Sequence, residues 1–134
     1  MNSFLRGEIA AVETYQMALD KLDKASSARD ELLTNLKSHQ DRVMALQDAI
    51  AAIGGTPATG SGPWGTFAKA VEGSAKILGD KATVAALEEG EDHGLKDYKK
   101  DAGDVHPDCE HIVGKLISLQ QQSHDRLSAL KRRL

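Results

Sequence analysis

The sequence predicts an all-α protein, a four-helix bundle built from two helical hairpins that a long crossover joins. Apolar residues recur three and four positions apart over four long stretches, which is helical spacing. Aromatic residues make up only 4% of the chain, and β-branched residues never alternate as they do in strands. The length of 134 residues suits one domain. We therefore expect a single four-helix domain over residues 1–134.

The first hairpin is predicted from two apolar stripes. The first helix covers about residues 3–24, with Leu5, Val12 and Leu19 on one face. Ser26 and Ser27, with an acid three residues after Ser27, give an N-cap signal for the second helix. Its stripe consists of Leu32, Leu36, His39, Val43, Leu46, Ile50 and Ile53. The glycine pair 54–55 ends this helix.

The second hairpin follows a crossover over residues 54–79, which begins with a Gly- and Pro-rich stretch and carries a short helix in its later part. The third helix has Val84, Leu87 and Tyr98 in register and ends near Gly103. Pro107 suits the first turn of the fourth helix. One face of that helix carries Val113, Ile117, Gln120, His124, Leu127 and Leu134.

Composition excludes several classes of function. The net charge is −3 with both signs interspersed, so we expect no nucleic-acid partner. No apolar run approaches 18 residues, so neither a membrane span nor a signal peptide is expected. The single cysteine, Cys109, fits a small buried hydrophobe in a cytoplasmic protein.

Phe4 and Met17 are candidates for the face of a homodimer. The sequence indicates no nucleophilic catalytic group, no other catalytic residue and no small-molecule substrate.

Two short phrases of the sequence each recur once in similar form. Residues 7–15 read GEIAAVETY and residues 90–98 read GEDHGLKDY, an offset of 83. Residues 41–46 read DRVMAL and residues 125–130 read DRLSAL, an offset of 84. Two copies are too few for a solenoid. The repeat therefore predicts two similar hairpins packed about a pseudo-twofold axis.

Each apolar stripe contains one ionisable residue: Glu8, His39, Glu91 and His124. A carboxylate in a low-dielectric core is disfavoured unless it is protonated, paired or bound to a cation. Folding each hairpin about its turn brings His39 within about one helical turn of Glu8, and His124 within one to two turns of Glu91. Carboxylates and imidazoles that project inward from facing helices are typical of metal sites in bundles. We name these four residues as candidate metal ligands, with a surrounding shell of Tyr15, Tyr98, Gln121, Glu88, Arg42 and Arg126.

With this pattern of residues, the chain resembles the ferritin-like superfamily, which contains rubrerythrins and bacterioferritins. It is specifically similar to the small bacterial branch whose function is unassigned. In that superfamily the first and third helices each supply a glutamate followed by a tyrosine seven residues later, as in Glu8 with Tyr15 and Glu91 with Tyr98. The resemblance spans the chain. It implies a site for one or two metal ions, iron or zinc, and a role in handling iron or peroxide under stress. If the protein is an enzyme, the resemblance implies a metal-dependent oxidoreductase.

The second half of the family pattern is incomplete. The second and fourth helices of the superfamily each carry Glu-x-x-His, whereas Leu36 precedes His39 and Gln121 precedes His124. Aligning the glycines after the second helix instead moves His39 to the glutamate place and Arg42 to the histidine place. The alternative is a metal-free structural or interaction bundle. In that case Tyr15, Tyr98, His39 and His124, or the guanidinium groups of Arg42 and Arg126, satisfy the two glutamates.

Overall fold

The computed structural model describes residues 1–62 and 79–134, and these residues form four long helices without a strand. The helices are α1 (Asn2–Lys21), α2 (Arg29–Ala52), α4 (Gly79–Asp101) and α5 (Glu110–Arg133). Two short 3-10 turns, η2 (Ala102–Asp104) and η3 (Pro107–Cys109), join α4 to α5. The prediction of an all-α bundle is confirmed.

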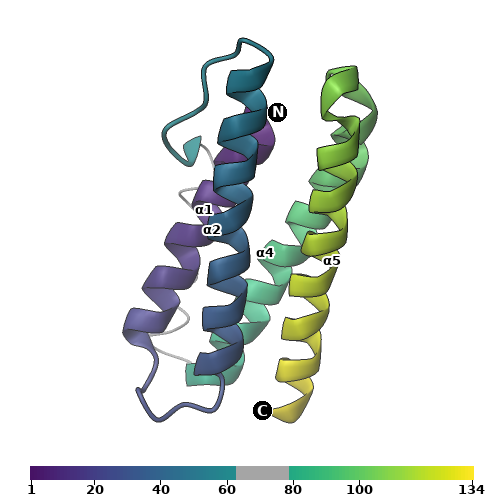
Figure 1. The fold of residues 1–134 in the computed structure, drawn as a ribbon. Coiled ribbons are helices and arrows are strands. Elements are labelled where there is room, and N and C mark those ends of the chain that lie inside the picture. The colour runs from purple at the N-terminus through teal and green to yellow at the C-terminus, as the bar shows by residue number, and fades with distance from the viewer. Residues whose placement is uncertain (63–78) are drawn as a thin grey trace.

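Figure 1 shows two hairpins side by side, α1 with α2 and α4 with α5. The most extensive contacts lie within these hairpins, and α2–α5 and α1–α4 contacts join one hairpin to the other. Helices α2 and α4 run in the same direction, so α2 ends and α4 begins at opposite ends of the molecule (Figure 1). The short helix predicted within the crossover, and Trp64, lie outside the described residues.

Helix α2 differs from the prediction at its start and agrees with it at its end. Helix α2 begins at Arg29 with Ala28 as its N-cap, so the prediction that Ser27 caps it is wrong. The Ser26 hydroxyl instead accepts a hydrogen bond from the Ala28 amide within the preceding turn. The predicted end of α2 at its glycine pair is correct. Gly54 has a φ of 81°, and the Gly55 amide donates to the Ile50 carbonyl at 2.9 Å, as in a Schellman motif.

Two apolar clusters fill the bundle and a polar layer separates them. Nearer the α1–α2 turn lie Tyr15, Leu19, Leu22, Leu32, Val84, Leu87, Leu127 and Leu130. Toward the other end lie Phe4, Leu5, Leu46, Ile50, Tyr98, Val113 and Leu116. Cys109 is a free, buried thiol, as its sequence context predicts. The two clusters supply the hydrophobic stabilisation, and the layer between them contains the charges.

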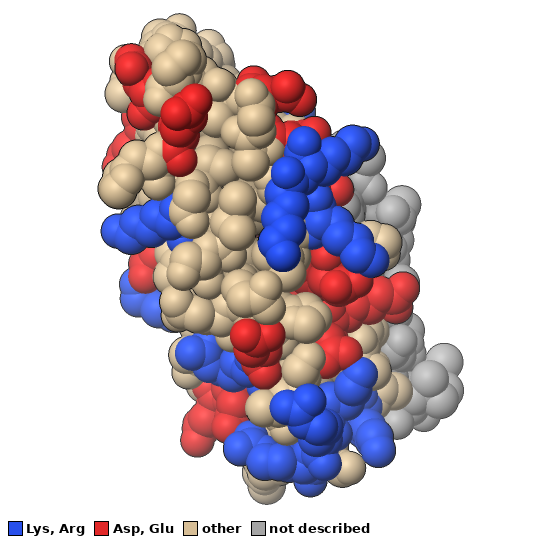
Figure 2. Space-filling model, turned by 90° about the vertical axis from the view of Figure 1, so that its right-hand side faces the viewer, with Lys and Arg blue, Asp and Glu red and all other residues tan. Residues whose placement is uncertain are grey.

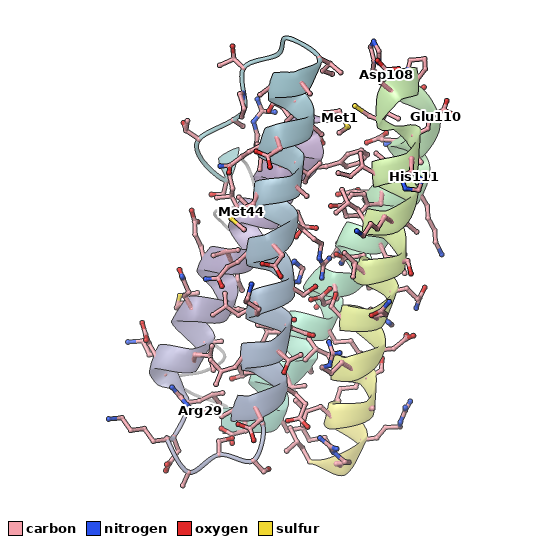
Figure 3. The ribbon with its side chains drawn as sticks, in the orientation of Figure 1. Met1, Arg29, Met44, Asp108, Glu110 and His111 are labelled. Atoms are coloured by element: carbon pink, nitrogen blue, oxygen red, sulfur yellow. The ribbon has the colours of Figure 1, made fainter. Side chains whose placement is uncertain are left out.

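The two residues predicted for a dimer face are not exposed. Phe4 is buried and stacks on Tyr98 with ring centroids 4.6 Å apart, and Met17 packs partly buried against an apolar cluster. The buried face of α1 is wider than the stripe that contains Leu5 and Leu19, and it includes neighbouring positions such as Phe4. The large apolar side chains exposed among the described residues are Leu33, Met44 and Ile53. In Figure 3 the Met44 side chain points away from the bundle.

The outer surface carries charges of both signs. On the face in Figure 2, patches of acidic and basic side chains lie among uncharged residues, and a basic group lies at the end of the molecule where α5 finishes. The last turn of α5 contains Lys131, Arg132 and Arg133, where cations complement the negative end of the helix dipole. None of the described helices combines the length and the apolarity that crossing a membrane requires.

Candidate functional site

The polar layer is a buried network to which all four helices contribute. Its central members are Glu8 from α1, His39 and Arg42 from α2, Glu91 from α4, and Gln120 and Ser123 from α5. Each has at most 3% of its surface exposed. In Figure 3, nitrogen and oxygen atoms gather between α2 and the α4–α5 hairpin at about half the height of the bundle. The structure thus brings together three of the four predicted ligand residues.

His39 connects the two glutamates directly. Its Nδ1 lies 2.5 Å from Glu8 Oε2, and its Nε2 lies 2.7 Å from Glu91 Oε1. Because an ionised carboxylate only accepts hydrogen bonds, both imidazole nitrogens must carry protons. His39 is therefore an imidazolium cation that bridges two carboxylates from opposite hairpins.

The pKa values agree with this assignment. Burial alone would lower the pKa of His39, but the charges of Glu91 and Glu8 outweigh it and raise the pKa from 6.5 to about 9. Burial would raise the pKa of Glu91, but His39 and hydrogen bonds from the neighbouring hydroxyl groups lower it to about 2. Burial opposes ionisation of Glu8 as well, yet His39 and Arg42 hold its pKa below the usual value. All three groups are charged at neutral pH.

The two tyrosines explain why the Gly-Glu phrase occurs twice. The Tyr15 hydroxyl on α1 donates to Glu91 Oε1 at 2.6 Å, and the Tyr98 hydroxyl on α4 donates to Glu8 Oε1 at 2.7 Å. Each tyrosine therefore bonds the glutamate of the other copy of the phrase. Burial and the adjacent carboxylates raise the pKa of both phenols, so both remain protonated donors. The repeat encodes a reciprocal contact between the two hairpins.

Arg42 supplies the second buried positive charge. Its Nη1 lies 3.3 Å from Glu8 Oε1 and also bonds the Gln120 side-chain oxygen. Its Nη2 donates to the hydroxyl oxygen of Ser123 at 2.9 Å and to that of Ser38 at 3.0 Å. The guanidinium therefore links α2 to both α1 and α5. Two cations, His39 and Arg42, balance two carboxylates.

Helix α5 meets the network through different residues from those predicted. Gln120 Nε2 donates to the backbone carbonyl and to Oε2 of Glu91, both at 2.8 Å, and the Ser123 hydroxyl donates to Glu91 Oε2 at 2.7 Å. His124 lies outside the network: its side chain is 21% exposed and its Nδ1 is 3.3 Å from Asp125. Gln121 also turns outward and bonds Asp125. Gln120 and Ser123, which enter the network, each precede the predicted residue by one position, which is about 100 degrees around a helix.

Two further predicted members of the shell lie at its margin or beyond it. Glu88 accepts from the Ser128 hydroxyl at 2.6 Å and from Lys131 at 2.5 Å, so it joins α4 to α5 away from Glu8 and Glu91. Arg126 does not reach a glutamate of the network, but its Nη1 donates to the Asn35 side-chain oxygen at 2.7 Å. Asn35 in turn donates to the Tyr15 hydroxyl and the Ser123 carbonyl, both at 3.0 Å.

Sequence reasoning missed Gln120, Ser123 and Asn35 as members of the site. For Ser123 a signal was available in the offset of 84 between the DRVMAL and DRLSAL phrases. This offset makes Ser123 the repeat equivalent of His39, and Arg126 that of Arg42. In the structure His39 and Arg42, three residues apart on α2, are both buried. Asn35 lies one turn before His39, and nothing in the local sequence distinguishes it from a surface amide.

The donor set does not fit a metal ion as it is arranged. Both nitrogens of His39 carry protons, whereas a metal binds neutral imidazole. Glu8 accepts three hydrogen bonds from protein side chains, and the two carboxylate oxygens of Glu91 accept four. In the described part of the chain, no three or more His, Cys, Asp or Glu side chains are grouped to hold a metal. Iron or zinc would have to displace His39 and Arg42 from the carboxylates.

Gly94 makes the Gln120 contact geometrically feasible. A Cβ added at Gly94 would lie 2.7 Å from Gln120 Nε2, the atom that bonds Glu91. We expect Gly94→Ala to lower the free energy of unfolding by about 1 to 3 kcal/mol, because the displaced amide leaves buried hydrogen bonds unmade. The matched control is Gly114→Ala on α5, whose added Cβ meets nothing within 4 Å. This control should gain about 0.5 to 1 kcal/mol from helix propensity.

Urea unfolding of the wild type and the two variants measures this difference. A stabilised Gly94→Ala protein would show that Gln120 can move without loss, and that its bonds to Glu91 contribute little.

Comparisons of the chain with protein-family models, with curated proteins and with solved structures found no match. The chemistry of the buried residues therefore carries the functional interpretation.

Proposed function

We propose that this protein is a metal-free structural or interaction bundle of ferritin-like ancestry, in which buried protein cations replace the charge of a metal centre. The observation that carries the proposal is the position of His39, whose two N–H groups bond Glu8 and Glu91. A second cation, Arg42, lies one turn further along the same face of α2. If the glycines after the second helix are aligned with the ferritin-like pattern, His39 and Arg42 take the glutamate and histidine positions of Glu-x-x-His.

The proposed role of the network is to fix how the two hairpins pack. Apolar side chains tolerate sliding of one helix along another, because leucine contacts leucine in several registers. A buried carboxylate does not tolerate it, since removing one charged partner costs about 3 to 5 kcal/mol. A slip of one helical turn, about 5.4 Å, would separate Glu8 or Glu91 from His39. The network therefore selects one register at the level of all four helices.

Metal content and its thermal consequences test the proposal. We expect protein purified without chelator or His-tag to contain no stoichiometric iron or zinc, and its melting temperature to change by less than about 1 °C with Fe(II) or Zn(II). A metal at a hundred times its dissociation constant would add about 2.7 kcal/mol of stability. For a domain of this size that is a rise of roughly 10 °C.

Two sets of variants locate any metal that is found. Metal that is lost in Glu8→Ala and Glu91→Ala would overturn the proposal in favour of a core metal centre. Metal that is lost only in His93→Ala or His111→Ala would identify surface binding and leave the proposal standing, because both histidines are exposed. In Figure 3, His111 lies in the first turn of α5.

A further inference from the structure

A cleft lies between α1 and α4, on the side of the bundle where the two copies of the Gly-Glu phrase face each other. Small residues form its walls, including Gly7 and Ala11 from α1 and Gly90 and Gly94 from α4. Its floor is the buried network, with Glu8, His39, Glu91 and both tyrosines in the lining. The cavity volume is about 70 Å³. At about 30 Å³ per water molecule, it has room for roughly two waters or a small organic group.

The polar lining of the cleft can accept hydrogen bonds but has few donors to offer. Both His39 nitrogens, the Tyr15 hydroxyl and the Gln120 amide already donate to the glutamates. The Tyr98 hydroxyl donates to Glu8 and receives no hydrogen bond from a described residue, so its lone pairs are available. Glu8 Oε2 accepts from His39 alone among the described residues, which leaves it a further acceptor site.

The charge of the lining has the same preference. Within the network, His39 and Arg42 balance Glu8 and Glu91, whereas Asp97 adds a third carboxylate to the cleft. The remaining lining is mainly apolar, with Phe4 and Leu87 beside the small residues. A cation can leave water in such a place because carboxylate and phenol oxygens replace its hydration.

We propose that the cleft between α1 and α4 binds a small molecule of the primary-ammonium class, with a cationic head on the Glu8–Tyr98 acceptors and a short alkyl body against the glycine and alanine walls. The glycines have a specific part in this proposal, since Gly7 and Gly90 line the cleft and side chains there would narrow the space for the alkyl body. This site goes beyond the structural role proposed above, because the network can fix the helix register whether or not the cleft is filled.

Titration with n-propylammonium, followed by two-dimensional ¹H–¹⁵N NMR of the full chain, tests this directly. We expect saturable shifts at the amides of Gly7, Gly90 and Gly94, with a dissociation constant of about 1 mM or below. The amides of Gly103 and Gly114, outside the lining, should not move. Propionate has a similar size and the opposite charge, and it should cause no saturable shift. Absence of saturable shifts at the three cleft glycines, or equal binding of propionate or n-propanol, would overturn the proposal.

Two pairs of variants distinguish the cleft from other sites. Ala11→Leu should abolish binding by filling the cleft, whereas Ala51→Leu, at an exposed position of α2, should retain it. Asp97→Asn should weaken n-propylammonium binding several-fold, whereas Asp92→Asn, outside the lining on the same helix, should not. Circular dichroism checks that each variant is folded. Unchanged binding in a folded Ala11→Leu protein would place the ligand elsewhere and defeat the proposal.

Discussion

Replacement of His39 by glutamine should lower the free energy of unfolding by about 3 to 5 kcal/mol. Glutamine has a similar size but no charge, and its single amide nitrogen cannot donate along both directions that the imidazolium serves. Two carboxylates would then share a buried space with Arg42 as their only cation, so one buried charge would lack a partner. Urea unfolding at pH 6, where wild-type His39 is fully protonated, measures the loss.

The matched control is His93→Gln on α4. His93 is exposed, so this change should lie within about 0.5 kcal/mol of the wild type. An equal effect of the two substitutions would show that the bridge adds no more than a surface histidine does, and the proposed role of the network in fixing the helix register would then be untenable.

Stability should fall by about 3 kcal/mol as the pH rises from about 6.5 to about 9. The pKa of His39 is about 9 in the folded protein, against 6.5 for an unperturbed histidine, the value taken for the unfolded chain. A group whose pKa is raised on folding contributes stability that is complete below the unfolded pKa and is lost as the pH rises through the folded pKa. A pKa difference of roughly 2.5, at about 1.4 kcal/mol for each pKa unit, gives the expected loss.

On the acid side the sign is reversed. The pKa of Glu91 falls from 4.5 to about 2 on folding, so its contribution is present above pH 4.5 and is lost as the pH falls through 2. Maximum stability is therefore expected between about pH 4.5 and 6.5. The lower pH limit comes from Glu91, whose pKa falls on folding, and the upper pH limit comes from His39, whose pKa rises on folding.

The control for the alkaline loss is the His39→Gln variant. Its unfolding free energy should be nearly independent of pH between 6.5 and 9, apart from groups that titrate alike in both proteins. An NMR titration of the His39 ring in the wild type gives the pKa directly, should the variant not fold. Parallel stability curves for the two proteins, or a ring that titrates near 6.5, would show that His39 is not the bridging cation.

The network also has an energetic cost, which is the reason for proposing specificity as its role. Replacing a buried ion pair by apolar residues of similar volume is often neutral or stabilising, because charges lose their hydration on burial. Four charges in the core are thus a poor means of adding stability, but a strong penalty on any packing that separates them. The two apolar clusters on either side of the network contain the leucines that stabilise the bundle.

Much of the fold could be predicted from local patterns. The three-four spacing placed the first helix at about residues 3–24, and the structure has α1 over Asn2–Lys21. The glycine pair after α2 ended that helix because Gly54 adopts a positive φ that other residues avoid. The start of α2 was less predictable. Ser26 bonds Asp80 of α4 instead of capping α2, a tertiary contact that no local signal announces.

The sequence alone determined which helices form and which residues of α1, α2 and α4 carry charge inward, because a carboxylate or imidazole within an apolar stripe has to face the core with it. Only the tertiary structure decided which of these side chains form hydrogen bonds with one another. It brought Gln120 and Ser123 to Glu91 and left His124 near the surface, because the buried face of α5 includes Leu116, Ser123 and Leu130 and does not include His124. Whether a residue or its neighbour completes a buried face changes the chemistry of a site while hardly altering the hydrophobic pattern, and periodicity cannot resolve it.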